Sequence, residues 1–318
     1  MPAPEPDLSA AGAAPSPPAA SIRRVLVLAD RTRPRVGETL DEVAAWLAPR
    51  VDELVCEREA RGLERLSPDL VVVLGGDGAI LGAARAFAAA PVPTLGIHFG
   101  RVGFLASATA SRWRDVLEGV LAGRGIVEER MRLEARREQA GREDVWVALN
   151  EVVVQRGAHQ GMLTASLWLG EQWVTSYRAD GLIVATPSGS TAYSLAAGGP
   201  ILAPSLSALV VTPVASQGLS SRPIVLHADS PLTVRVERAS GISTVVVDGQ
   251  AFAGLEQGGT VTVNRHPVPY PLLSMPGLDP YRRLRSRLGW GAGGAVEVFP
   301  SEGRPEPPDV DGGDGHEL

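Results

Sequence analysis

The first half of the chain alternates short apolar runs with segments of helical spacing. The apolar runs predict strands, and the segments between them predict helices. Strands that alternate with helices along a chain imply a parallel sheet covered on both faces. We therefore expect an open parallel α/β domain over residues 21–125. The expected strands are Arg24–Asp30, Leu70–Leu74 and Thr94–Ile97, and the expected helices are Glu38–Leu47, Ala79–Ala90 and Ser111–Leu121.

From about Ile126 the pattern changes to short β-rich runs separated by Gly, Asn, Asp and Pro. It predicts a mostly β domain over residues 126–275, with one helix near Ser190–Ala197. Residues 276–298 have helical spacing again and are expected to pack back on the first domain. The expected fold class is therefore α/β + β. The expected strands of the second domain are Val145–Val154, Leu163–Leu169, Trp173–Arg178, Leu182–Thr186, Leu209–Thr212, Leu232–Glu237, Thr244–Val247 and Val261–Asn264.

Both ends of the chain are expected to be disordered tails. Residues 1–20 are rich in Ala, Pro and Ser, and residues 299–318 are rich in Pro, Gly, Asp and Glu. Residues 1–20 lack the basic start and unbroken apolar stretch of a signal peptide. No apolar run reaches the ~18 residues of a transmembrane helix. We therefore expect a cytoplasmic protein with no membrane partner. The single Cys56 excludes an intrachain disulfide and a Cys-based zinc site.

The chain contains no lysine, because all 30 residues counted as Lys or Arg are Arg. This excludes a Schiff-base lysine, a P-loop lysine and the catalytic strand lysine of protein kinases. A bound phosphate must therefore be held by Arg, a metal ion or backbone N–H groups. The net charge of −6 argues against a nucleic-acid partner. The clustered Arg132, Arg136 and Arg137 are interpreted as part of a solvated face.

A glycine-rich turn, Gly75-Gly76-Asp77-Gly78, follows an apolar strand and precedes a helix. This position is the carboxyl end of a parallel strand, where open α/β sheets bind ligands. The helix N-terminus offers unpaired N–H groups to a phosphate, so Gly75, Gly76 and Gly78 are candidate phosphate-binding residues. Asp77 could take a proton from a substrate hydroxyl or hold a metal. The motif alone also fits a tight strand-to-helix turn with Asp77 as a capping residue.

A second segment rich in small residues covers residues 180–199. It contains a turn, after which Ser190 or Thr191 can cap a short helix. Such a loop lets a flat or anionic ligand lie against the backbone, and Tyr193 could offer a ring face or a hydroxyl. An ordinary strand–turn–helix connection is the alternative.

Two shorter motifs are weaker signals. Asn150 and Glu151 open an apolar run and could hydrogen-bond a ribose or an adenine edge, although the pair taken alone is better explained by a strand-end Asn turn. Val247-Asp248-Gly249-Gln250 predicts a type I′ hairpin turn. His98, just after a buried strand, could line a ligand cleft. No pair of histidines has metal-ligand spacing on one helix, so no metal site is assigned.

Together and in order, these segments resemble the ATP-dependent NAD kinases. The resemblance extends from about Val25 to Trp290, and its longest block is highly specific, whereas the GGDG tetrapeptide is shared with diacylglycerol and sphingosine kinases. The segments that carry it are LGGDGAIL at Leu74–Leu81, GIHFGRVGFLA at Gly96–Ala106, NEVVV at Asn150–Val154, RADGLIVATPSGSTAYSLAAGGPIL at Arg178–Leu202, VTPVASQGLSSRPIV at Val211–Val225, VVVDGQ at Val245–Gln250 and LRSRLGW at Leu284–Trp290.

The resemblance implies phosphoryl transfer from ATP, or another phosphoryl donor, to the 2′-hydroxyl of the adenosine ribose of NAD. It implies that Asp77 is the catalytic proton acceptor, that a divalent metal ion such as magnesium takes part, and that the protein is a homodimer or homotetramer. The NAD-binding positions that it implies are Asp77, Gly78, Asn150, Glu151, Arg178, Asp180, Thr191, Ala192, Tyr193, Ser194, Leu195, Ala196, Ala215 and Gln250.

Several positions depart from the usual pattern of the family. They bear on the affinity for the dinucleotide phosphates and on the choice of donor, and they leave Arg178 as the main matched cation. The departures are Ala79 in place of Thr, Gly82 in place of Arg, His98 in place of Asn, Gly161 in place of a basic residue and Gln217 in place of His.

Two other functions remain open at this point. A lipid kinase of the diacylglycerol or sphingosine type would share the GGDG motif, but the segment over residues 180–199 favours a dinucleotide. A non-catalytic NAD(P)-binding regulator would explain Gly82 and Gly161, but the intact Asp77 argues against it.

Overall fold

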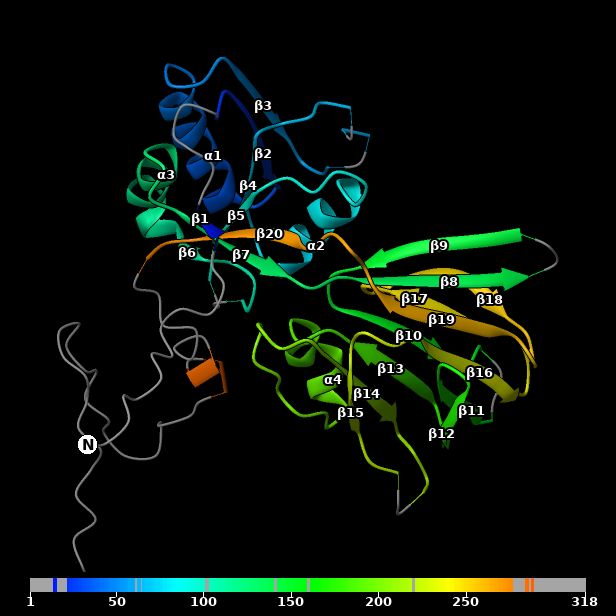
Figure 1. Cartoon of the computed structure of the whole chain (residues 1–318). Helices are drawn as coiled ribbons and strands as arrows, with labels where there is room; N and C mark the ends of the chain where they lie inside the picture. The colour runs from blue at the N-terminus through cyan, green and yellow to red at the C-terminus, as the bar shows by residue number, and fades with distance from the viewer. Residues whose placement is uncertain are drawn as a thin grey trace, which may run out of the picture.

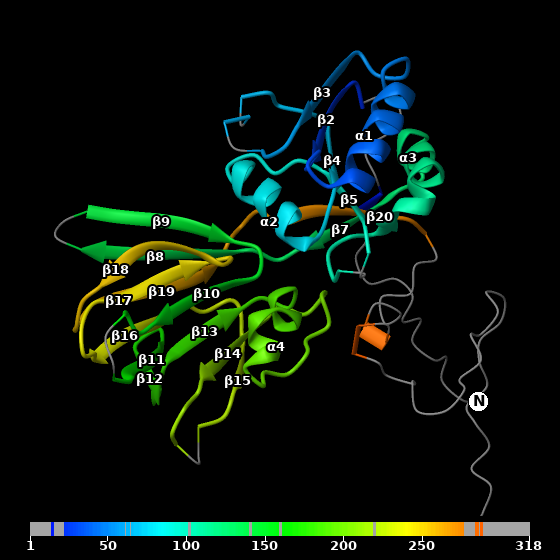
Figure 2. The same cartoon turned by 180° about the vertical axis from the view of Figure 1, so that it is seen from behind.

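The chain forms an α/β domain and a β sandwich (Figure 1). Two crossing segments join them, residues 131–132 between β7 and β8 and residues 266–269 between β19 and β20. The computed structural model describes residues 14–15, 22–60, 62–63, 65–100, 103–139, 142–158, 161–218, 221–276, 284–285 and 287–288. The view from behind shows α2 on the side of the first domain that faces the sandwich (Figure 2). The expected α/β + β class is confirmed.

The first domain is built on a mostly parallel sheet of eight strands within the described residues. Its order is β1-β7-β20-β5-β4-β2-β3, with β6 beside β5. The central neighbours β3, β2, β4 and β5 are parallel, whereas β7 runs antiparallel to both β1 and β20. The strands are β1 (Ala14–Pro15), β2 (Arg24–Ala29), β3 (Glu53–Glu57), β4 (Leu70–Leu74), β5 (Thr94–His98), β6 (Ala108–Thr109), β7 (Ile126–Arg130) and β20 (Tyr270–Ser274).

Helices cover both faces of this sheet, as the apolar strands required. On one face, α1 (Pro34–Leu47) and α3 (Trp113–Leu121), preceded by the 3₁₀ turn η2 (Ala110–Arg112), pack in one buried cluster. On the other face, α2 (Asp77–Ala86) packs in a second cluster. The alternation of β4, α2 and β5 places the N-terminus of α2 at the carboxyl end of β4, where α/β sheets bind ligands.

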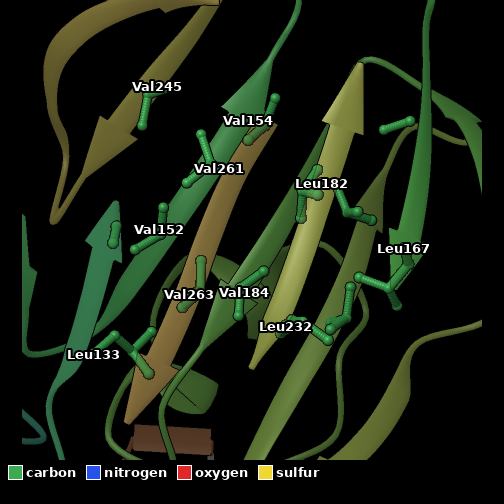
Figure 3. Close-up of a cluster of buried hydrophobic side chains, with 14 of the residues drawn as sticks. Leu133, Val152, Val154, Leu167, Leu182, Val184, Leu232, Val245, Val261 and Val263 are labelled. Carbon is green, nitrogen blue, oxygen red and sulfur yellow. The ribbon is translucent and has the colours of Figure 1, made fainter. Parts of the chain in front are cut away.

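The second domain packs two antiparallel sheets of six described strands each around a core of Val, Leu and Ala (Figure 3). One sheet has the order β15-β14-β13-β10-β17-β18 and the other β12-β11-β16-β19-β8-β9. The strands are β8 (Leu133–Gln139), β9 (Arg142–Ala148), β10 (Glu151–Gln155), β11 (Leu163–Leu169), β12 (Gln172–Ala179), β13 (Gly181–Ala185), β14 (Ala208–Val214), β15 (Ile224–His227), β16 (Leu232–Arg238), β17 (Ser243–Val247), β18 (Gln250–Leu255) and β19 (Thr260–Arg265).

A short helical segment covers the outer face of the first of these sheets. It consists of the 3₁₀ turn η3 (Gly189–Thr191) and α4 (Tyr193–Ala196). Leu202, which follows it, is buried against the outward side chains of β10, β13 and β14. The helix expected near Ser190–Ala197 is therefore present, although its α-helical part is one turn long.

The sheets do not follow the expected domain boundaries at residues 126 and 275. Leu273 of β20 pairs with Val127 of β7, and Leu272 pairs with Thr94 of β5, so both strands belong to the first sheet. The pattern of apolar and polar residues could not show this, because a short apolar run does not reveal which sheet the strand joins. The expected single run Val145–Val154 is two strands, interrupted at residues 149–150.

The expected tails and C-terminal segment are described only in part. Ala14–Pro15 pair with β7, and the rest of residues 1–20 and all of residues 299–318 lie outside the described residues. Within residues 276–298, the described residues 284–285 and 287–288 are helical. The Arg287 guanidinium lies 5.2 Å from the ring centre of Phe104 in the first domain.

Arg132 ties both crossing segments to the end of α2. Its side chain is fully buried, so the expected solvated face is wrong for this residue, whereas Arg136 is exposed. Nε donates to the Val268 carbonyl (2.8 Å) and Nη1 to the Ala88 carbonyl (2.7 Å). Nη2 is 3.2 Å from Nδ1 of His266. The carbonyl of Ala88 lies just beyond α2, where the helix dipole favours a positive charge.

We expect Arg132→Met to lower the free energy of unfolding by about 3 kcal/mol, because it removes the charge-assisted hydrogen bonds from a buried guanidinium to two backbone carbonyls. Urea denaturation followed by circular dichroism measures this change. Arg136→Met is the matched control, because its exposed ion pairs with Glu134 and Glu143 are screened by solvent and contribute little to stability. Equal losses of stability in the two variants would contradict the role given to Arg132.

Candidate active site

Asp77 is the first residue of α2, directly after the glycine turn that ends β4. The Gly75 amide donates to the Ile97 carbonyl (2.9 Å), which extends the pairing of β4 and β5 by one bond. Gly76 is the N-cap of α2, and no side chain caps this helix. The first-turn amides of α2 therefore need another acceptor, and an anionic ligand can supply it.

The carboxylate of Asp77 is held by the loop that follows β5. The Phe104 amide donates to Oδ2 (2.8 Å) and the Leu105 amide to Oδ1 (3.1 Å). Gly103 makes room for this contact, since a Cβ on Gly103 would lie 2.0 Å from Oδ1 of Asp77. These two amide bonds fix the direction of the carboxylate. Asp77 is thus oriented by a neighbouring loop as well as by its own helix.

The turn between β17 and β18 carries a second oriented carboxylate. Asp248 and Gly249 have φ values of 45° and 76°, so the predicted type I′ turn is confirmed. The Asp248 carboxylate accepts the amides of Leu149 (2.8 Å), Asn150 (2.8 Å) and Glu151 (3.1 Å). One side chain therefore fixes the backbone that leads into β10.

Asn150 and Glu151 present buried polar atoms beside that turn. Each residue is 7% exposed, and Oδ1 of Asn150 and Oε2 of Glu151 have no hydrogen-bond partner among the described residues. Burial, together with the nearby Asp248 charge, raises the pKa of Glu151 to about 8. Burial also raises the pKa of Asp248, while its three amide bonds and Arg85 oppose that shift. With a pKa of about 8, Glu151 is mostly protonated at neutral pH.

The loop after β13 packs directly against the same backbone. Oγ1 of Thr186 donates to the Leu149 carbonyl (2.7 Å), and the Thr186 amide donates to the Asn150 carbonyl (2.8 Å). Gly189 sits so close that a Cβ there would lie 2.1 Å from the Asn150 oxygen. The small residues of this segment thus allow the loop to approach Asn150 and Glu151.

The α2 helix connects the Asp77 and Asp248 groups across the domain junction. Leu149 is buried in the same cluster as the core-facing residues of α2. Nη2 of Arg85, at the other end of α2 from Asp77, is 3.4 Å from the Asp248 carbonyl. Asp77 lies about 12 Å farther along this helix, at 1.5 Å per residue. The junction therefore carries the oriented Asp77 carboxylate at one end of α2 and the buried polar atoms of Asn150 and Glu151 near the other.

A second group of the predicted residues lies at the other end of β10 and β13. Glu151 pairs with Ala185, which is five residues along the chain from Asp180, so Asp180 is about 17 Å from the Glu151 end of the sheet. Oδ1 of Asp180 accepts Nε of Arg156 (2.9 Å). Together with Tyr193, Asp180 lines a hollow of about 310 Å³ on the outer face of the sheet.

The other predicted positions surround these two groups. The side chains of Arg178, Ala215 and Gln250 are exposed, and Tyr193 is 42% exposed. Ser194 is buried and hydrogen-bonds Thr212. Thr191 belongs to η3, Leu195 and Ala196 belong to α4, and Ala192 links the two. The sequence indicated all of these positions but could not show that they separate into two groups.

Two of the departures from the family pattern have different local settings. Gly161 has a φ of 127°, and a Cβ there would lie 2.1 Å from Oγ of Ser240, so the backbone itself disfavours a basic side chain. Gly82 has open space around it. A larger side chain would therefore fit at position 82, and the structure gives no steric reason for glycine there.

Sequence reasoning missed Asp248, Arg85 and the Gly103–Leu105 loop as parts of the site. Asp248 was interpreted as a turn residue, which it is, and nothing in its local sequence indicates a carboxylate that binds amides 97 to 99 residues away. The GFL sequence at residues 103–105 was a signal only through the family resemblance.

The described residues contain no helix of the length and apolar character needed to cross a membrane. They also contain no group of three or more His, Cys, Asp or Glu side chains arranged to hold a metal ion.

An oriented carboxylate at an uncapped helix N-terminus suits transfer of a phosphoryl group to a hydroxyl. The comparisons with known proteins agree. Residues 25–125 match the family of the ATP-NAD kinase N-terminal domain, and residues 149–274 match that of the ATP-NAD kinase C-terminal domain. The NAD kinase of Heliobacterium modesticaldum is 38% identical over 277 residues, which cover 83% of this chain and 98% of that protein. The NAD kinase of Burkholderia pseudomallei is 39% identical over 272 residues, covering 81% and 90%.

Two solved structures share the fold. The crystal structure of yeast NADH kinase complexed with NADH has a TM-score of 0.78 at 23% identity and covers 88% of this chain and 90% of that one. The structure of an NAD kinase from Archaeoglobus fulgidus in complex with ATP has a TM-score of 0.67 at 27% identity, covering 84% and 97%. The chain belongs to the NAD kinase family and is a kinase that transfers phosphate to a hydroxyl group. The family and the relatives found support neither of the two alternatives, a lipid kinase or a non-catalytic NAD(P)-binding regulator.

We expect Gly103→Ala to lower kcat for NADP formation by about 100-fold, because its Cβ displaces the Asp77 carboxylate and misplacement by about 1 Å has an effect of that size. A coupled assay with a dehydrogenase that requires NADP measures the rate. Gly37→Ala, in α1 on the opposite face of the sheet, is the control and should keep normal turnover. Normal kcat in Gly103→Ala would show that this loop does not orient Asp77.

Proposed function

We propose that the protein transfers a phosphoryl group from ATP to the 2′-hydroxyl of the adenosine ribose of NAD, with Asp77 accepting the hydroxyl proton. The observation that carries this proposal is the Asp77 carboxylate, fixed by the Phe104 and Leu105 amides at the N-terminus of α2. A carboxylate so fixed can align one hydroxyl for attack and receive its proton as the new P–O bond forms.

Phosphoryl transfer depends mostly on alignment and on neutralising the charge of the transferred group. The uncapped first turn of α2, with Gly76 and Gly78, offers backbone N–H groups to the phosphates. The chain has no lysine to do this, so amides and arginines must provide the protein's share of positive charge. Asp77 stands where the donor phosphate and the acceptor hydroxyl would meet.

Asn150 and Glu151 are proposed to bind the dinucleotide. Their unpartnered oxygens lie beside Asp248 at the junction, where a polar ligand edge would satisfy both. With its pKa raised to about 8, Glu151 donates a hydrogen bond at neutral pH, while Oδ1 of Asn150 accepts one. The site thus offers a donor and an acceptor side by side, as a ribose or an adenine edge requires.

The donor set fits a divalent ion that arrives with the nucleotide. Among the described residues, Asp77 is the carboxylate placed to meet it, and Mg²⁺ is commonly bound by one or two carboxylates together with substrate phosphates. When bound, the ion would neutralise developing charge on the phosphates. Orientation of the acceptor hydroxyl remains the task of Asp77.

We also propose a cytoplasmic homo-oligomer with neither a membrane nor a nucleic-acid partner. The separation of the site into two groups supports the oligomer, because Asp180, which lines the hollow, lies about 17 Å from the Glu151 end of the sheet. In a dimer or tetramer, residues of the second group, Arg178, Asp180, Tyr193 and Ala215, would serve the dinucleotide bound near Asp77 of a neighbouring copy.

We expect Asp77→Asn to lower kcat by about 10²–10⁴-fold, the usual contribution of a positioned proton acceptor. The dissociation constant for NAD, measured by calorimetry, should stay within about threefold, because Asn150 and Glu151 are unchanged. Asp115→Asn, an exposed carboxylate in α3, controls for loss of charge. Near-normal turnover by Asp77→Asn would contradict the proposed role.

Co-expression of two differently tagged variants tests the oligomer. Asp77→Asn lacks the proton acceptor and Asp180→Ala lacks the second group, so each alone should have low turnover. Mixed oligomers, isolated through both tags, should recover activity, because some of their sites combine an intact Asp77 with an intact Asp180 from another copy. A monomeric protein, or a mixed oligomer no more active than its parents, would contradict this proposal.

A further inference from the structure

The Asp248 carboxylate organises a segment that it does not adjoin in sequence. It belongs to the β17–β18 turn, yet its two oxygens accept three consecutive amides, those of Leu149, Asn150 and Glu151. Three successive N–H groups that point to one carboxylate require a sharply bent backbone. This bend interrupts the apolar run between β9 and β10.

The carbonyls of the same three residues are fixed as well. Oγ1 and the amide of Thr186 donate to the carbonyls of Leu149 and Asn150. The Asp248 amide donates to the Glu151 carbonyl (3.0 Å). The backbone of this segment is therefore held on both sides, whereas Oδ1 of Asn150 and Oε2 of Glu151 remain without partners among the described residues.

We propose that Asp248 is a positioning residue for NAD binding, which rests on the proposed function. By holding the three amides, it directs Asn150 and Glu151 into the junction so that their free oxygens meet a ribose or an adenine edge together. Asp248 itself points at the backbone and does not touch the dinucleotide.

The charge of Asp248 has a second effect on the same site. Burial and this charge together raise the pKa of Glu151 to about 8, which keeps Glu151 a hydrogen-bond donor at neutral pH. Arg85 of α2 is the charged group that acts on Asp248 from the first domain. The positioning contact and the protonation of Glu151 thus depend on one side chain.

The test compares Asp248→Asn with Asp69→Asn. Asp69 also binds consecutive amides, those of Arg23 and Arg24, but it precedes β4 and is about 17 Å from the end that carries Asp77. We expect Asp248→Asn to raise KM for NAD about tenfold or more and to leave KM for ATP within about twofold. Asp69→Asn should change neither value.

The pH dependence adds a readout that a purely structural role would not move. In the wild type, KM for NAD should be constant below about pH 7 and rise above about pH 8, as Glu151 ionises and ceases to donate. In Asp248→Asn the rise should begin at lower pH, because a cause of the raised pKa is gone. Glu151→Gln should abolish the rise.

Asp248→Glu keeps the charge but displaces the carboxylate, and it serves as the second variant if Asp248→Asn does not fold. It should raise KM for NAD with the wild-type pH dependence. Wild-type KM values for NAD in the folded variants, or equal losses for NAD and ATP, would overturn the inference while the kinase function stands. A wild-type protein that makes no NADP would overturn the proposed function and this inference together.

Discussion

The Asp248 carboxylate, with the three amides that it accepts, is the contact on which the arrangement of the site depends. It joins the β17–β18 turn to the start of β10. Thr186 adds the loop after β13 to the same backbone, and Arg85 adds α2 of the other domain. A buried carboxylate is costly unless its oxygens are hydrogen-bonded, and consecutive amides satisfy that need. The same geometry leaves Oδ1 of Asn150 and Oε2 of Glu151 without hydrogen-bond partners among the described residues.

The two domains contribute unlike chemistry to this junction. The parallel sheet places Asp77 at an uncapped helix N-terminus, which suits phosphate and a reacting hydroxyl. The sandwich supplies a rigid frame with a buried donor and acceptor, which suits recognition of a nucleoside. Arg132 joins the crossing segments to the end of α2, so it links the parts of the two domains that carry these groups. Because backbone amides and side chains other than lysine are offered at the junction, the absence of lysine is consistent with an NAD kinase.

The centre of the first domain could be predicted, because β2, β4 and β5 are largely apolar runs and its glycine turn is local. The helix start at Asp77 and the type I′ turn at Asp248 are likewise set by neighbouring residues. The rest depends on contacts between distant segments. No local pattern shows that β7 and β20 join the first sheet, that Arg132 is buried, or that Asp248 binds amides up to 99 residues away. The separation of Asp180 from Glu151 follows from the strand register alone.

The central claim is that this junction places the 2′-hydroxyl of NAD for phosphoryl transfer. Phosphorus NMR of the products formed by the wild-type protein from NAD, ATP and Mg²⁺ tests it most directly. The account predicts a new phosphomonoester resonance of a 2′-phosphate, with one ADP formed for each NADP. ADP release without that resonance, or a phosphate on another hydroxyl, would contradict it.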